Sequence, residues 1–331
     1  MEPDRIAARD RLIAEAGLAG AAVGPLAADA SFRSYDRIVH PDGRRAVLMN
    51  APPGLEDVRP FHRVADLLSG WGLSAPTVIE ADTNAGFLLL EDLGDDLFSR
   101  LIAQGHDEVQ LYAAAVDVLI ALARQAPPAD LPAYDMDLLL TEADLMPDWY
   151  APHCGVTLTP GEREAYRHAW RSCLGQVAAV TDTLVLRDYH VDNLIWLPER
   201  HDVAQVGLLD FQDAVRGHAA YDLASLLSDV RRDVPPQIEA AMLDRYIAGT
   251  ACSSERLRTA YTVLAAQRNT KILGIFTRLS ARDGKDGYLR WLPRTWRLLE
   301  RDLRHPALAP VAAWFDNHLP NVPSVESGQS R

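Results

Sequence analysis

The sequence predicts an α+β fold with a small β-rich N-terminal lobe and a larger helical C-terminal lobe. In the first 95 residues, short apolar runs alternate with turn signals, which is typical of a small antiparallel sheet. Further along the chain, apolar residues recur at the spacing of amphipathic helices. A length of 331 residues accommodates two lobes. We expect the first lobe at 1–94, the second at 95–319 and a loose polar tail at 320–331.

The N-terminal lobe is expected to begin with a helix and to continue as two hairpins separated by a second helix. The turn His40-Pro-Asp-Gly-Arg44 predicts the first hairpin, because an Asp-Gly pair favours a tight reversal between strands. Apolar residues at helical spacing predict the intervening helix at 57–70. The expected strands are 34–40, 46–49, 78–81 and 87–91.

The C-terminal lobe is expected to be mainly helical and to follow a linker, Asp92-Leu-Gly-Asp95. A β interruption is predicted at 194–197 and 205–209, because two short apolar runs flank a polar turn there. The expected helices are 108–124, 160–180, 219–230, 236–248, 255–282 and 288–303.

Composition narrows the class of protein. The net charge is −13, and an acidic surface repels phosphate backbones, so we expect no nucleic-acid partner. Cys154, Cys173 and Cys252 lack the spacing of a disulfide framework or a zinc site, which favours a reducing compartment. No uncharged apolar run reaches the roughly 18 residues of a membrane helix. We therefore expect a cytoplasmic protein without a membrane or an obligate protein partner.

The clearest chemical signal is a polar cluster between apolar strands. An apolar run leads into Asp188, Asn193 begins the next run, and a hairpin returns the chain to Asp210. Because a hairpin brings its two ends together, these three side chains are expected to converge. Two carboxylates and an amide supply only oxygen ligands, which suit Mg²⁺. The alternative is that the acidic residues belong to turns and that Asn193 is a cap.

Several motifs identify a family. Arg187-Asp188 with Asn193 five residues later, followed by Leu209-Asp-Phe211, resembles the catalytic and metal-binding elements of the protein-kinase-like fold. The version with Tyr189-His190 is similar to the aminoglycoside phosphotransferase and choline kinase family. Within that family, other stretches resemble the anomeric N-acetylmuramate/N-acetylglucosamine kinases of peptidoglycan recycling, among them Asp29-Ala-Ser-Phe-Arg33, Met49-Asn-Ala-Pro-Pro53, Lys271-Ile-Leu-Gly-Ile-Phe276 and His305-Pro-Ala-Leu-Ala-Pro310.

The resemblance implies a bilobal kinase-like fold that binds ATP and Mg²⁺. By this resemblance Asp188 is the catalytic base, and Asn193 and Asp210 hold Mg²⁺ against the phosphates. Asp222 supports the catalytic loop, or is simply a carboxylate at the start of a helix. His190 is expected to be a positioned loop histidine, since it has no second ligand at zinc spacing.

Several residues that bind the nucleotide or orient the catalytic loop in the family differ in this sequence. Leu186 stands where the family usually has His, and no glycine-rich loop is present. Small residues, Ala30 and Ser31, would let backbone N–H groups approach phosphate in its place. The phosphate-binding lysine is also missing, because the chain has lysines only at positions 271 and 285.

Arginine is expected to replace that lysine. The candidates are Arg33 and Arg45, although each taken alone reads more readily as a solvated surface arginine. In the kinase-like fold the adenine binds backbone groups of the linker, here Glu91 and Leu93. The alternative for this segment is simply the end of a strand.

Acceptor residues are inferred from their chemistry. Asp192 and Asp213 adjoin the catalytic elements and could bind sugar hydroxyls. Arg268 and Lys271 could pair with the carboxylate of a muramate, or lie on a solvated helix face. We expect an ATP-dependent kinase acting on the anomeric hydroxyl of an amino sugar. The alternatives are a phosphotransferase for aminoglycosides or other small amines and alcohols, and a nucleotide-binding pseudokinase.

Overall fold

The computed structural model describes residues 3–28 and 32–319. The predicted phosphate-loop residues Ala30 and Ser31 and the predicted tail at 320–331 lie outside the described residues. The chain divides into two compact units, 1–118 with 191–214, and 119–190 with 215–331. The predicted lobe boundary at residue 94 stays a prediction, because this division follows packing and assigns the hairpin at 194–208 to the first unit.

The first unit is built on a five-stranded antiparallel sheet with the strand order β1-β2-β3-β5-β4. Both predicted hairpins are present, β2 with β3 and β4 with β5, and pairing of β3 with β5 joins them. An additional strand, β1, pairs with β2 at the edge of the sheet. The strands are β1 Ala22–Ala28, β2 Ser34–Val39, β3 Arg45–Asn50, β4 Val78–Asp82 and β5 Phe87–Glu91.

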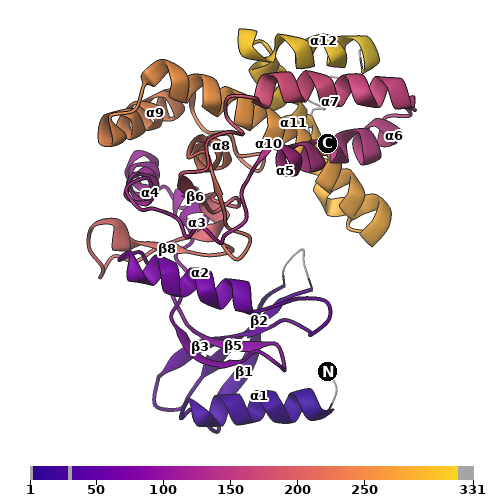
Figure 1. Cartoon of the computed structure of the whole chain (residues 1–331). Helices are drawn as coiled ribbons and strands as arrows, with labels where there is room; N and C mark the ends of the chain where they lie inside the picture. Colours follow the sequence, from indigo (N-terminus) through magenta and orange to yellow (C-terminus); the bar gives the residue numbers. More distant parts are fainter. Residues whose placement is uncertain (1–2, 29–31, 320–331) are drawn as a thin grey trace. The chain divides into compact units, whose positions relative to one another are not determined.

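Both faces of the central strands are buried, as their almost continuous apolar sequence requires. One set of alternate side chains faces helix α1 (Pro3–Glu15), which lies along one side of the sheet (Figure 1). That layer consists of Ala8, Leu12, Ile13, Ile38, Ala46, Leu48, Phe87 and Leu89. Each fully buried large side chain stabilises the fold by roughly 1.5–3 kcal/mol. Helix α2 (Arg59–Gly70) lies on the other side of the sheet (Figure 1).

A further hairpin, outside the five-stranded sheet, belongs to the same unit. Strands β7 (Leu194–Trp196) and β8 (Val206–Leu208) pair in antiparallel register, which confirms the predicted β interruption. The segment after α2 anchors β8, because Leu208 N–H donates to the carbonyl of Ser74 at 2.8 Å. Short helices flank the hairpin: α3 (Phe98–Ala103), η2 (Val191–Asn193) and η3 (Asp202–Gln205).

The second unit is mainly helical, which confirms the predicted fold class. Its small sheet pairs β6 (Thr183–Val185) with β9 (Val215–Gly217). Helices α7 and α12 lie side by side (Figure 1), with the rings of Tyr166 and Trp314 4.8 Å apart. The helices are α5 Met136–Ala143, η1 Met146–Tyr150, α6 Ala151–His153, α7 Pro160–Leu174, α8 Ala220–Leu227, α9 Pro236–Thr250, α10 Ser254–Asp283, η4 Asp286–Trp291, α11 Leu292–Leu303, η5 Pro306–Leu308 and α12 Ala309–His318; α4, Glu108–Leu122, runs across the division between the units.

Helix α10 is the central element of this unit. Its 30 residues follow the N-cap Ser253, whose hydroxyl accepts from the Arg256 N–H, and precede the C-cap Gly284, which lies in the left-handed region at φ +65°. Most of its middle section is buried, including a run of polar residues from Gln267 to Thr270. Polar side chains at such depth need hydrogen-bond or ionic partners, so this helix contributes polar interactions to the core as well as apolar packing.

Candidate active site

The first unit contains a cavity of about 380 Å³. Val47 and Leu90 from the sheet and Phe61 from α2 supply apolar walls. The linker after β5 and the ends of the β7–β8 hairpin also line it. Flat apolar walls with a few convergent polar groups are typical of a small-molecule or cofactor site. The polar lining residues from the hairpin are Asp192, Asn193 and Asp210.

The linker is held by an ion-pair network centred on the buried carboxylate of Asp92. Asp92 has 3% of its side chain exposed and receives Arg37 Nε and Arg45 Nε, each at 2.9 Å. Arg37 also pairs with Asp95 at 2.9 Å. Arg45, a predicted phosphate ligand, therefore binds the linker. A carboxylate this deeply buried depends on such cations, because an unpaired buried charge is strongly unfavourable.

The two predicted adenine-binding residues line the cavity. Glu91 ends β5, and its side chain bonds to Thr77 and pairs with Arg200. These bonds commit the Glu91 carboxylate to other protein groups. Leu93 is buried against Ile195 and Leu197. Both residues keep their predicted assignment to the nucleotide, which concerns their backbone groups.

Asp210 occupies a strained position at the end of β8. Its φ of +57° lies in the left-handed region, which is unfavourable for a residue other than glycine. Packing compensates for this strain, because the next residue, Phe211, is fully buried and stacks on Phe61 at 4.7 Å. The Asp210 carboxylate accepts hydrogen bonds from Arg33 Nη2 at 3.0 Å and Gln212 Nε2 at 2.9 Å. Arg33, the other predicted phosphate ligand, thus reaches an acidic group that lines the cavity.

Asn193 and Asp210 meet at the open end of the β7–β8 hairpin. The carbonyl of Asn193 accepts the N–H of Leu209 at 3.0 Å, and both side chains line the cavity. Within 3–28 and 32–319, no group of three or more His, Cys, Asp or Glu side chains could hold a metal ion. The pair therefore fits Mg²⁺ only if phosphate oxygens and water complete its shell, which is how proteins usually bind this ion.

Asp188 belongs to the second unit, so its predicted convergence with Asn193 and Asp210 stays a prediction. It follows β6 in a tight loop, where its N–H donates to the carbonyl of Leu186 at 2.9 Å. The preceding residue, Arg187, has a φ of +72°, again in the left-handed region.

The side chain of Asp222 binds the backbone of this loop. The two carboxylate oxygens of Asp222 accept the N–H groups of Leu186 at 2.7 Å and Arg187 at 2.9 Å. Only 2% of Asp222 is exposed. Burial raises the pKa of Asp222 to about 7, although the two backbone hydrogen bonds act in the opposite direction. From the start of α8, the Asp222 carboxylate thus binds the loop that precedes Asp188.

The predicted acceptor cations of α10 are buried. Arg268 is 4% exposed, and its positive charge acts to lower the pKa of Asp222. Lys271 Nζ pairs with Glu142 at 2.8 Å. A solvated helix face, the alternative for these residues, is therefore excluded. Their contact with an acceptor stays a prediction.

The remaining predicted residues surround these elements. His190 is 5% exposed, with its Nε2 3.3 Å from Arg231 Nη1, which fits a positioned loop histidine. Asp192 lines the cavity, and Asp213 accepts from Gln212 Nε2 at 3.2 Å. Sugar binding by Asp192 and Asp213 stays a prediction.

Sequence reasoning missed Glu142, which pairs with both Lys271 and Arg187. One signal could have found it: Glu142 shares the buried face of α5 with Leu139, Leu140 and Ala143. An acidic residue on a buried helix face needs cationic partners elsewhere in the chain.

Across the described residues, no helix combines the length and apolar character needed to cross a membrane. The cysteines Cys154, Cys173 and Cys252 are free thiols.

Comparison with known proteins identifies the family. The model of the phosphotransferase enzyme family matches residues 22–258. An N-acetylmuramate/N-acetylglucosamine kinase of Caulobacter vibrioides is 38% identical over 97% of this chain and 98% of its own. A kinase of the same name from Pseudomonas aeruginosa is 40% identical over 87% and 86% of the two chains.

The fold comparison agrees. The structure of aminoglycoside phosphotransferase APH(2'')-Ib with ADP matches at a TM-score of 0.59 and 14% identity, over 91% of this chain and 97% of that chain. Because the family model covers the sheet, the β7–β8 hairpin and the loop of Asp188 together, the match includes every element that carries a proposed catalytic residue. The chain belongs to the phosphotransferase enzyme family.

Proposed function

We propose that this protein is an ATP-dependent kinase that phosphorylates N-acetylmuramate and N-acetylglucosamine at the anomeric hydroxyl. The observation that carries the proposal is the likeness, over nearly the whole chain, to relatives named for these two sugars. Within that likeness the chain keeps Asp188, Asn193 and Asp210, the residue types that phosphoryl transfer needs.

The nucleotide is assigned to the cavity of the first unit. The adenine lies between the apolar walls and binds backbone groups of Glu91 and Leu93. Asn193 and Asp210 would hold Mg²⁺, which when bound neutralises the charge that develops on the transferring phosphoryl group. This arrangement accounts for the polar residues Asn193 and Asp210 in an otherwise mainly apolar lining.

Arg33 is our choice for the cation that replaces the missing lysine. Its guanidinium lies 3.0 Å from the Asp210 carboxylate, and the residue is 9% exposed. A cation held beside a proposed metal ligand is close to where the phosphates would bind. Arg45 is the weaker choice, because it pairs with Asp92 on the linker.

Asp188 is the proposed catalytic base. The anomeric oxygen attacks the γ-phosphorus, a new O–P bond forms, and the bond from phosphorus to the β–γ bridging oxygen breaks to release ADP. The hydroxyl proton passes to the Asp188 carboxylate. An anomeric hydroxyl is more acidic than an ordinary alcohol, so Asp188 mainly orients it and accepts its proton late.

The test is an acceptor panel with purified protein, ATP and Mg²⁺. The acceptors are N-acetylmuramate, N-acetylglucosamine, kanamycin and choline, and ADP release is measured for each. We expect turnover of the two amino sugars and its loss in Asp188→Asn. A matched control is Asp66→Asn, which makes the same change at a carboxylate 72% exposed on α2 and should retain turnover.

Two other outcomes would overturn the proposal. Preferential turnover of kanamycin or choline would assign the chain to another acceptor class. Nucleotide binding without turnover of any acceptor would make it a pseudokinase. Comparing Arg33→Ala with Arg45→Ala tests the phosphate assignment, since only the former should raise the KM for ATP by tenfold or more.

A further inference from the structure

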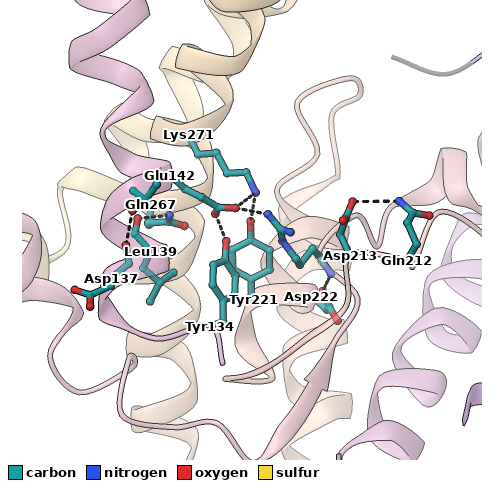
Figure 2. A network of polar contacts seen from close by, with 12 residues as sticks. Tyr134, Asp137, Leu139, Glu142, Gln212, Asp213, Tyr221, Asp222, Gln267 and Lys271 are labelled. Carbon is teal, nitrogen blue, oxygen red and sulfur yellow. Dashed lines mark hydrogen bonds and ion pairs between the residues drawn. The ribbon is translucent and has the colours of Figure 1, made fainter. Parts of the chain in front are cut away.

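A buried charge cluster in the second unit surrounds the side chain of Arg187. We define the anchor cluster as Tyr134, Glu142, Arg187, Tyr221 and Lys271. Figure 2 shows Glu142 between Tyr134 and Lys271, with Tyr221 next to the lysine. The Glu142 carboxylate accepts from the Tyr134 hydroxyl, from Arg187 Nη2 and, at 2.8 Å, from Lys271 Nζ.

Charge explains why Glu142 stays ionised in this place. Only 8% of its side chain is exposed, and burial alone would raise its pKa. Lys271 and Arg187 outweigh that effect, so the pKa of Glu142 is below its usual range. A carboxylate with two cationic partners stays charged and can hold each of them firmly.

Aromatic rings complete the surroundings of both cations. Arg187 Cζ lies 5.6 Å from the ring centre of Tyr134, and Lys271 Nζ lies 5.9 Å from that of Tyr221. The rings of Tyr134 and Tyr221 contact each other edge to face, 4.8 Å apart. Cations over aromatic faces gain electrostatic attraction, so the arginine side chain is held on several sides.

The residue held in this way is itself strained. Arg187 has a φ of +72°, and a side-chain-bearing residue keeps such a backbone only where its surroundings fix it. Asp222 fixes the backbone N–H of Arg187. Glu142 fixes the other end of the same residue, its guanidinium. Asp188 follows directly in the chain.

We propose that Glu142 is a positioning residue for Asp188. Glu142 binds the Arg187 side chain and thereby keeps the left-handed backbone conformation of Arg187, directly before Asp188. Lys271 and Tyr134 hold Glu142 in place. The inference rests on the proposed function insofar as Asp188 is the base, and it adds residues from α5 and α10 to the machinery.

The decisive experiment compares Arg187→Gly with Arg187→Ala. Both changes remove the clamped side chain, but glycine adopts a positive φ without steric penalty and alanine does not. If the cluster serves the turn, Arg187→Gly should retain a kcat about fivefold higher than Arg187→Ala. Equal kcat values would assign the side chain a direct role and overturn the proposal.

A second comparison tests Glu142 itself. Glu142→Gln keeps the shape of the side chain and removes its charge, and we expect kcat to fall at least tenfold with both KM values within about twofold. In the Arg187→Gly background the same change should alter kcat by less than twofold, because the clamped group is gone. A raised acceptor KM at unchanged kcat would make the cluster part of the acceptor site instead.

The control is Glu239→Gln. Glu239 also binds a tyrosine and an arginine, accepting from the Tyr261 hydroxyl at 2.7 Å and pairing with Arg301 at 2.9 Å. This variant makes the same chemical change in a similar cluster on α9, so kcat should stay within twofold. An equal loss of kcat in both variants would show a general effect on stability and overturn the proposal.

Amide hydrogen exchange separates this inference from the proposed function, because it needs no acceptor. Glu142→Gln should speed exchange in the peptide 184–190 at least tenfold, while the sheet of the first unit is unchanged. Should the panel identify another acceptor, kcat is measured with that acceptor and the inference on Glu142 stands or falls on the same comparisons. Unchanged exchange in 184–190 would refute it whatever the acceptor.

Discussion

Asp222 provides a measurable link between pH and the stability of the protein. Its pKa is raised from the ordinary 3.8 to about 7, because burial disfavours the carboxylate more than its two backbone hydrogen bonds favour it. The folded protein therefore binds a proton on Asp222 at pH values where the unfolded chain has lost it. The contribution of Asp222 to the free energy of unfolding therefore falls as the pH rises from about 4 to about 7, and it is constant above pH 7.

The size of the effect follows from the shift. Each pKa unit is worth about 1.4 kcal/mol, so the full window corresponds to about 4 kcal/mol, and the part between pH 5 and pH 7 to about 3 kcal/mol. Asn at this position stays neutral at every pH. Relative to Asp222→Asn, the wild type should thus lose about 3 kcal/mol of unfolding free energy between pH 5 and pH 8.

The assay is urea unfolding of both proteins at pH 5, 6, 7 and 8. Taking the difference removes the other titrating groups, such as Asp302, whose pKa burial also raises to about 7. A difference that is constant with pH, or that moves in favour of the wild type, would show that Asp222 is ionised in the folded protein throughout this range. In that case the two hydrogen bonds from Leu186 and Arg187 outweigh burial, and the reasoning above is wrong.

Two further substitutions test packing and the linker. Gly274→Ala should lower the free energy of unfolding by about 3 kcal/mol, because the added Cβ would lie 2.3 Å from backbone atoms of Leu145; an unchanged urea midpoint would contradict this. Asp92→Asn should raise the dissociation constant for nucleotide roughly tenfold, as measured by calorimetry, because the linker then loses its pairing with both arginines, whereas Arg45→Ala leaves Arg37 in place; unaltered affinity would mean that the linker needs no such pairing.

Local chemistry made much of the first unit predictable. The turn at 40–44 forms as expected, with His40 N–H bonded to the Arg44 carbonyl and Gly43 N–H to the His40 carbonyl, both at 2.9 Å. Gly43 takes a φ of +93°, the conformation for which a glycine is needed. Signals of this kind depend on neighbouring residues alone, so a single sequence contains them.

Other features depend on distant partners and were not predictable in this way. Strand β1, with the sequence Ala22-Val-Gly-Pro-Leu-Ala-Ala28, has neither alternation nor β-branched residues beyond one valine, and forms because β2 offers its edge. Glu142 has two cationic partners that are distant in the chain: Arg187 is 45 residues away and Lys271 is 129 residues away. Their meeting requires the packing of α5 and α10, which no local pattern contains.

Leu186 illustrates how the two kinds of information combine. By resemblance to the family, a histidine is expected there, and its absence, together with the missing lysine, motivates the alternative of an inactive kinase. Leu186 is buried, and its backbone N–H is bound by Asp222. The following residue is held at its backbone by Asp222 and at its side chain by Glu142. Two buried carboxylates thus bind the residues just before Asp188, in a loop that has no histidine at position 186. A scaffold released from catalysis would have no need to keep a strained arginine between two such carboxylates, so this departure from the family pattern favours an active enzyme.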